Sequence, residues 1–117
     1  MKLSKYFDRS EFACGCGCGF DTVYSELLRV LDEIRAGFDR PVRIHSACRC
    51  PNHNRAVGGS TGSQHLIGRA ADISVGNTHP GTVADMAEEL LPEGGVGRYN
   101  TFTHVDSRGT RARWDFR

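Results

Sequence analysis

The sequence lacks long apolar runs and an excess of charge of either sign. None of its 117 residues belongs to an uninterrupted apolar stretch approaching the roughly 20 residues that a membrane-spanning helix needs. The opening MKLSKYFDRSEF has no apolar core of a secretory signal, so we expect synthesis in the cytoplasm without a signal peptide and no membrane insertion. Lys and Arg number 15 against 14 Asp and Glu, which gives no electrostatic basis for binding nucleic acid.

Internal repeats, linkers and low-complexity tracts are also missing, so we expect one domain over residues 1–117. The composition, 38% hydrophobic and 25% charged, is typical of a globular domain, and 14 glycines favour a loop-rich fold. The last eleven residues are locally basic, with Arg108, Arg111, Arg113 and Arg117 against one aspartate. We interpret them as a solvated end or a minor docking patch.

Five cysteines fall into two groups, Cys14, Cys16 and Cys18, then Cys48 and Cys50. The odd number excludes a fully paired disulfide framework within one chain. The C-x-C spacing is tighter than the C-x₂₋₄-C that is typical of structural zinc sites. Free thiols in turns and packing positions are the favoured interpretation in a reducing cytosol. A second metal, a disulfide, or redox or metal sensing by the two groups is the alternative.

Apolar spacing of three and four residues predicts helices over Thr22–Phe38, with Asp21 or Thr22 as N-cap, and over Pro80–Leu91. A short helix is expected at Pro51–Val57. Alternating or β-branched segments predict strands at Pro41–Ala47, Ala70–Val75, Gly95–Tyr99, Phe102–Asp106 and Ala112–Phe116. The third and fourth strands are close enough to pair as a hairpin. The pattern predicts an α+β fold, with a mainly antiparallel sheet packed against two main helices.

Two segments carry residues that suit a catalytic metal. SQHLIGRAAD contains His65 and Asp72, and Gly68 between them allows a sharp turn before the strand that holds Asp72. THVD places His104 and Asp106 on one face of a later strand, because side chains repeat every two residues. Catalytic zinc takes three ligands from His, Asp, Glu or Cys and leaves one position open. Each piece alone also fits a hydrogen-bonded structural residue, but the combination of a turn, small residues and a later His-x-Asp strand is far more specific for such a site.

These motifs resemble those of a known enzyme family. SQHLIGRAAD fits the pattern S-x-H-x-x-G-x-A-x-D, THVD follows about thirty residues later, and HSACRCPNHN and the EFACGCGCG opening add to the likeness. The chain looks like the zinc D-Ala-D-Ala carboxypeptidases of peptidase family M15, and more narrowly like the small subgroup often encoded by bacteriophages and prophages. The resemblance covers nearly the whole chain. It implies the small α+β fold that these enzymes share with hedgehog signalling domains.

Carried over residue by residue, the resemblance implies that His65, Asp72 and His104 are the zinc ligands. It implies that Ser63 helps to hold the substrate and that Arg49 supports negative charge on the scissile carbonyl. A guanidinium suits this role because it stays charged and offers donors in a fixed geometry. The alternatives are a turn or helix cap for the serine and a surface ion pair for the arginine.

The general base departs from the family pattern. Relatives carry Glu three residues before the last zinc histidine, or a second His two residues before it, but here these positions are Thr101 and Phe102. Asp106 is the nearest carboxylate on the correct face, so we expect it to act as the base or, equally, to orient a ligand histidine. His45 and His53 flank the arginine in sequence and are weaker candidates for the cleft.

The resemblance implies zinc-dependent hydrolysis of peptide bonds in peptidoglycan stem peptides or cross-links, as a D-Ala-D-Ala carboxypeptidase or a murein endopeptidase. The expected partner is a peptidoglycan peptide, and a monomer is the favoured state. Without a signal peptide, the protein would reach the wall by phage-type release or as part of a virion. The alternative is a non-catalytic, zinc-stabilised binding or structural module of the same fold, which the two missing base positions make a real competitor.

Overall fold

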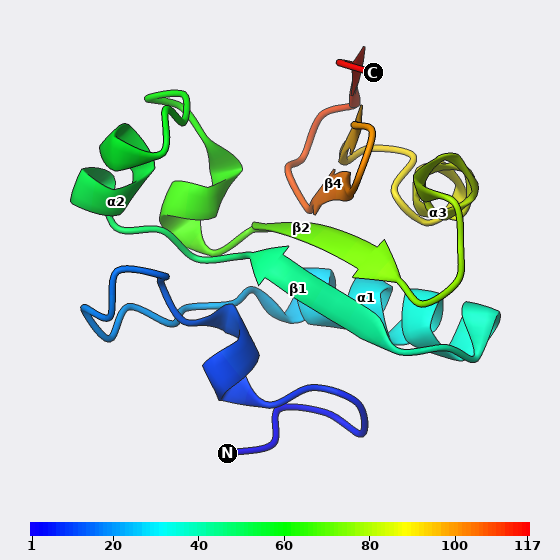
Figure 1. Ribbon diagram of the computed structural model, residues 1–117, viewed down its shortest axis with the longest axis horizontal. Coiled ribbons are helices and arrows are strands. Elements are labelled where there is room, and N and C mark those ends of the chain that lie inside the picture. Colours follow the sequence, from blue (N-terminus) through cyan, green and yellow to red (C-terminus); the bar gives the residue numbers. More distant parts are fainter.

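A five-stranded sheet forms the centre of the computed structural model, which describes residues 1–117 (Figure 1). Its strands are β1 (Val42–Ser46), β2 (Ala70–Val75), β3 (Gly95–Arg98), β4 (Thr103–Asp106) and β5 (Ala112–Asp115). They lie in the order β1-β2-β4-β3-β5, and every neighbouring pair is antiparallel except β3 and β5, which are parallel. The predicted α+β fold with a mainly antiparallel sheet, including the β3–β4 hairpin, is confirmed.

Three α-helices and two short 3₁₀ helices complete the fold. They are η1 (Arg9–Phe12), α1 (Ser25–Phe38), α2 (Pro51–Ala56), η2 (Gln64–Ile67) and α3 (Pro80–Leu90). The long helices α1 and α3 contact each other, and both pack on β2. The short elements α2 and η2 follow β1 and precede β2, so they lie at one end of that strand pair (Figure 1). None of the helices has both the length and the apolar composition that crossing a membrane requires.

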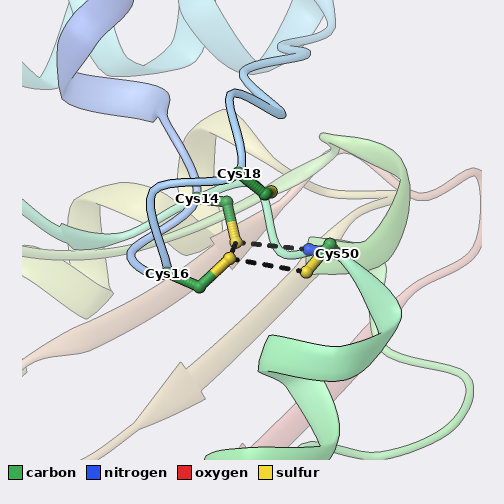
Figure 2. A group of neighbouring side chains, drawn as sticks. All are labelled: Cys14, Cys16, Cys18 and Cys50. Carbon is green, nitrogen blue, oxygen red and sulfur yellow. Dashed lines mark hydrogen bonds between the residues drawn. The ribbon is translucent and has the colours of Figure 1, made fainter.

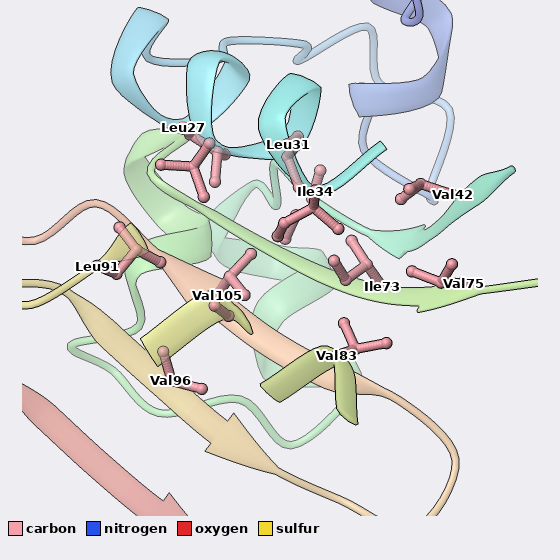
Figure 3. Close-up of a cluster of buried hydrophobic side chains, with 14 of the residues drawn as sticks. Leu27, Leu31, Ile34, Val42, Ile73, Val75, Val83, Leu91, Val96 and Val105 are labelled. Carbon is pink, nitrogen blue, oxygen red and sulfur yellow. The ribbon is translucent and has the colours of Figure 1, made fainter. Parts of the chain in front are cut away.

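The hydrophobic core lies between the sheet and the two long helices (Figure 3). Leu27, Leu31 and Ile34 recur at helical spacing along α1, and each is at most 1% exposed. They pack in the same cluster as Ile73 of β2 and Val105 of β4. Because side chains alternate along a strand, this packing turns the intervening residues of β2 and β4 toward the opposite face of the sheet.

Helix α1 begins at Ser25, three residues later than the sequence indicates, and no side chain caps it. The reason is tertiary. The N–H of Tyr24 donates to the carbonyl of Gly68 at 2.9 Å, so the chain before the helix runs beside the turn that follows His65. A Cβ at Gly68 would lie 2.5 Å from the carbonyl oxygen of Thr22. This close approach holds the preceding segment in an extended path, which a helix cannot follow.

The interpretation of the basic C-terminal segment as a solvated end is wrong for Arg108 and Arg113. Both are half-buried, and the Arg113 guanidinium donates to the carbonyls of Leu91 and Gly94, each at 2.7 Å. Each of these carbonyls also accepts one backbone N–H, from Gly94 and Ala112 respectively, so the guanidinium uses the second lone pair of each oxygen. Arg113 therefore stabilises the position of β5 at the edge of the sheet. Arg108 instead contacts Asp106 of β4.

Candidate metal centre

The register of the sheet brings the predicted ligands together. Asp72 of β2 is the Cα partner of His104 of β4, and both side chains leave the sheet on the face opposite the core. His65 comes from η2, which Ser63 caps by accepting the His65 N–H at 3.2 Å. After η2 the chain turns at Gly68, whose φ of 77° lies in the left-handed region. The predicted sharp turn between the histidine and β2 is thus confirmed.

The donor atoms of these three residues lie at metal-binding separations. Asp72 Oδ2 is 3.3 Å from His65 Nε2, and Asp72 Oδ1 is 3.0 Å from His104 Nδ1. One donor atom from each residue lies within 4.8 Å of the others. Tetrahedral zinc with bonds of roughly 2.0–2.1 Å requires donors about 3.3 Å apart. His65, Asp72 and His104 are 3%, 9% and 7% exposed, so little water competes for the donors.

The second nitrogen of each histidine is held by another group. His65 Nδ1 lies 2.6 Å from the carbonyl oxygen of Ala47, which can only accept, so this nitrogen carries the proton. His104 Nε2 lies 2.8 Å from Asp106 Oδ2 and donates to that carboxylate. The other ring nitrogens, His65 Nε2 and His104 Nδ1, both face Asp72, so they are the atoms that would offer lone pairs to a bound metal once it displaces their protons. Oriented histidine lone pairs beside a carboxylate are the donor set that a divalent metal requires.

Asp106 is fully buried, and both of its oxygens receive hydrogen bonds. Oδ1 accepts from the N–H of Gly95 at 3.1 Å, and from the N–H and Nε of Arg108 at 3.2 and 2.8 Å. Oδ2 accepts from His104 Nε2 and from Arg108 Nη2, each at 2.8 Å. Burial raises the pKa of Asp106, but these donors outweigh it and bring the pKa well below its usual range. The carboxylate is therefore ionised, and no oxygen is left to face the cleft.

The neighbouring groups also shift the pKa values of His104 and Asp72. Burial lowers the pKa of His104, but Asp106 and Asp72 outweigh it and raise the pKa above its ordinary value. Burial raises the pKa of Asp72, but hydrogen bonds from His104 and His65 bring it well below its usual range. Asp72 is thus the ionised member of the donor set, and a metal cation bound beside it would replace the protons of the histidines as its counter-charge.

Two glycines of β3 make room for this arrangement. A Cβ at Gly95 would lie 2.2 Å from Asp106 Oδ2, and a Cβ at Gly97 would lie 2.3 Å from Trp114 Nε1. The first glycine thus admits the buried carboxylate, and the second admits the indole ring of β5, whose centroid is 4.9 Å from that of His104. The G-x-G spacing of β3 follows from the alternation of a strand, because both positions face His104 and Asp106 of the candidate metal centre.

Arg49 lies directly beside the Asp72 carboxylate. Its Nη2 is 3.3 Å from Asp72 Oδ2, while Nε donates to Ser46 Oγ at 3.1 Å and Nη1 donates to Asn54 Oδ1 at 3.2 Å. A guanidinium has five N–H groups, so Nη1 and Nη2 each keep one that is unused by the protein. The three contacts fix the plane of the group and leave two donors for a ligand in the cleft.

A cleft of about 600 Å³ opens over the three donors, with Arg49, Ser63 and the glycine-rich loop 58–62 among its lining residues. The opposite wall is aromatic, formed by Tyr99, Phe102, Trp114 and Phe116. The rings of Tyr99 and Phe102 stack at 4.3 Å, and Trp114 Nε1 donates to the Tyr99 hydroxyl at 2.9 Å, so the tyrosine can still donate its own proton. The cleft combines a polar, cationic side with a flat apolar side, which suits a peptide.

A family model described as Peptidase M15 matches residues 5–106. The chain belongs to the M15 peptidase family. The match covers most of the chain and confirms the family that the motifs indicate, and it supports peptidase activity. No curated protein matches the chain significantly. The donors His65, Asp72 and His104 of the M15 domain lie inside the matched region, whereas the cleft wall formed by β5 lies beyond it.

Of the M15 domain's sequence-predicted site residues, six lie at the cleft or directly behind it: Arg49, Ser63, His65, Asp72, His104 and Asp106. His45 and His53 do not line the cleft; His45 bonds Ser74 Oγ, and His53 lies against Gly15. Sequence reasoning missed Arg108 and the aromatic wall. The available signals were the arginine two residues after Asp106 and the alternate glycines of β3, which allow bulky side chains to approach the strand closely.

Proposed function

We propose that this protein hydrolyses peptide bonds in peptidoglycan stem peptides or cross-links with one zinc ion held by His65 Nε2, Asp72 and His104 Nδ1. The observation that carries the proposal is the convergence of these donors on the floor of a cleft lined by Arg49. When bound there, zinc supplies a Lewis acid that polarises the scissile carbonyl and makes water nucleophilic near neutral pH.

The chain's own residues hold and orient the peptide. The two unused N–H groups of Arg49 can donate to the scissile carbonyl oxygen as negative charge develops on it, or to the terminal carboxylate of a stem peptide. Ser63 Oγ accepts the N–H that caps η2, which leaves its hydroxyl proton free to donate to a substrate carbonyl. The cap and the substrate contact are therefore compatible roles of one side chain.

Asp106 fits the orienting role better than that of general base. A base must reach the proton that it removes, and both oxygens of Asp106 are occupied and buried behind His104. Its hydrogen bond to His104 Nε2 instead fixes the tautomer that presents Nδ1 to the metal. Carboxylate–histidine pairs of this kind strengthen metal binding about 10–100-fold.

A second function is favoured by the composition of the cleft. Asp72 is the only carboxylate among the lining residues, so no independent acidic group faces the substrate. Loss of general-base assistance typically costs about 10²–10⁴-fold in rate. The competing proposal is therefore a zinc-stabilised module that binds peptidoglycan peptides without cleaving them. Under either proposal, the protein would reach the cell wall by phage-type release or as part of a virion.

The decisive experiment is mass spectrometry of purified muropeptides after incubation with the zinc-loaded protein. A carboxypeptidase shortens pentapeptide stems by one terminal alanine, whereas an endopeptidase splits cross-linked dimers. We expect His65→Ala and chelator treatment to abolish the product, and zinc to restore it after chelation. His45→Ala is the matched control, because it removes a histidine of the adjacent strand that lies outside the cleft, and it should retain full activity.

The two functions give different results in this assay. If the protein binds zinc and retains muropeptides but never changes their mass, the binding module is the correct function. If His65→Ala cleaves as fast as wild type, the proposed metal centre takes no part in the activity.

A further inference from the structure

Four of the five cysteines converge on one point, away from the cleft (Figure 2). Cys14, Cys16 and Cys18 come from the loop after η1, and Cys50 comes from the N-cap of α2. Their four Sγ atoms all lie within 4.8 Å of one another. We propose that these four thiolates bind a second zinc ion, in a closed structural site that is separate from the metal centre in the cleft.

The sulfur separations match those of a tetrathiolate zinc site. Cys14 Sγ lies 3.5 Å from Cys16 Sγ, which lies 3.7 Å from Cys50 Sγ. Tetrahedral zinc with Zn–S bonds of about 2.3 Å places its sulfurs about 3.8 Å apart. Four ligands also complete the coordination of zinc and leave no position for water or substrate, which is typical of a structural rather than a catalytic site.

Glycines explain how the narrow C-x-C spacing serves one ion. Gly17 and Gly19 have φ of 81° and 90°, and a Cβ at either would meet nothing within 4 Å. Their role is therefore conformational, because L side chains rarely adopt this backbone region. The Gly17 N–H also donates to the carbonyl of Cys14 at 3.1 Å, which closes a tight turn between the first and third cysteines. The turn brings three thiols of a short segment to one side.

Backbone donors already surround the sulfurs. The N–H of Cys50 points at Cys14 Sγ, and the N–H of His53 points at Cys50 Sγ, both at 3.4 Å. Such donors compensate the negative charge of thiolates that ligate a metal. Cys16 and Cys18 are exposed, so their convergence gains nothing from hydrophobic burial and requires another cause.

The proposed ion would join two distant parts of the chain. It would tie the loop after η1 to the segment next to Arg49, whose N–H donates to the carbonyl of His65 at 2.9 Å. Cys48 provides a contrast, because it is 1% exposed, outside the cluster, and its N–H donates to the carbonyl of Phe12 at 3.3 Å. The structure thus separates four metal-binding thiols from one that only packs, whereas the sequence favours free thiols for all five.

Metal counting tests the proposal independently of catalysis. Protein refolded with excess zinc under reducing conditions and then desalted should carry two zinc ions per chain. We expect one in Cys16→Ser and in Cys18→Ser, which remove exposed side chains and no packing, and two in the Cys48→Ala control. His65→Ala should lose the other ion and keep the cysteine-bound one. Two ions in Cys16→Ser, or a single ion in wild type that His65→Ala removes, would overturn the inference.

Two spectroscopic and chemical measurements identify the ligands. Cobalt(II) at this site should give the intense sulfur-to-metal charge-transfer absorption of a tetrahedral thiolate centre, and Cys16→Ser should weaken it while His65→Ala leaves it intact. Cys16 and Cys18 should react slowly with a thiol reagent until a chelator is added. Fast labelling of the zinc-loaded protein, a disulfide in the reduced preparation, or iron with inorganic sulfide in the site would each contradict a zinc tetrathiolate.

Discussion

Replacing Asp106 with asparagine changes no volume but removes an acceptor that five donors share. These donors come from Gly95, His104 and Arg108. Oδ1 accepts three of the hydrogen bonds and Oδ2 accepts the other two. An asparagine amide must turn its NH₂ toward one of the two sets, so either orientation sets donors against donors. The structure therefore predicts that no rotamer of the variant satisfies this buried network.

The expected magnitude follows from burial. Leaving buried donors without an acceptor costs about 1–3 kcal/mol, and the partly exposed Arg108 can turn to water for part of its lost ion pair. The His104 ring also loses the acceptor that fixes its tautomer, so the metal centre should bind zinc about 10–100-fold more weakly. Asp106→Asn should therefore be both less stable to denaturant and weaker in zinc affinity.

Asp115→Asn is the matched control. Asp115 accepts from the N–H, Nε and Nη2 of Arg117 in the same i,i+2 arrangement, but it is exposed at the end of the chain. Its replacement should leave both the denaturation midpoint and zinc affinity nearly unchanged.

Urea denaturation and competition with a metal-sensitive dye measure the two effects of Asp106→Asn. Saturating zinc should restore much of the variant's hydrolytic activity if Asp106 orients His104. A variant with wild-type stability and zinc affinity that has lost only kcat would refute this reasoning and make Asp106 the base.

Three further predictions concern the glycines and the metal. Gly68→Ala should destabilise the fold by about 1–3 kcal/mol in urea denaturation, because the position has φ of 77° and its Cβ would meet the Thr22 carbonyl. Gly97→Ala should displace Trp114, cost about 1–3 kcal/mol and shift the tryptophan fluorescence. Gly62→Ala, whose Cβ would meet nothing closer than 4.0 Å, should do neither in the same assays. Chelation should lower the thermal midpoint in calorimetry, and added zinc should restore it.

Much of the fold could be predicted because its elements carry strong periodicity. The helical spacing of α1 and the alternation in β2 and β4 depend on local sequence, and each element lies within a few residues of its predicted bounds. The start of α1 at Ser25 could not be predicted, since it depends on the contact of Tyr24 with a turn more than forty residues away. The parallel pairing of β5 with β3 is also a tertiary property, because nothing within Ala112–Asp115 specifies its neighbour.

The candidate site divides in the same way. Residue types and spacing identify His65, Asp72 and His104 as ligand candidates, because metal chemistry restricts which side chains can serve. Spacing alone could not decide how Asp106 acts, since both roles need a carboxylate on the same face of β4. The decision depends on Arg108 and on the N–H of Gly95, which occupy its oxygens, and these contacts exist only once the sheet has formed.

The segment that follows β1 lies between the two proposed metal sites. The carbonyl of Ala47 fixes the tautomer of His65, and Arg49 contacts Asp72. Cys48 and Cys50 contact the N-terminal part of the chain instead. The N–H of Cys48 donates to the carbonyl of Phe12, and the thiol of Cys50 contacts that of Cys16. The carbonyl of Ala47 and the N–H of Cys48 belong to one peptide unit and point to opposite sides, so this short stretch contacts both regions. A structural ion at the cysteines would thus hold the arginine in place without contacting substrate.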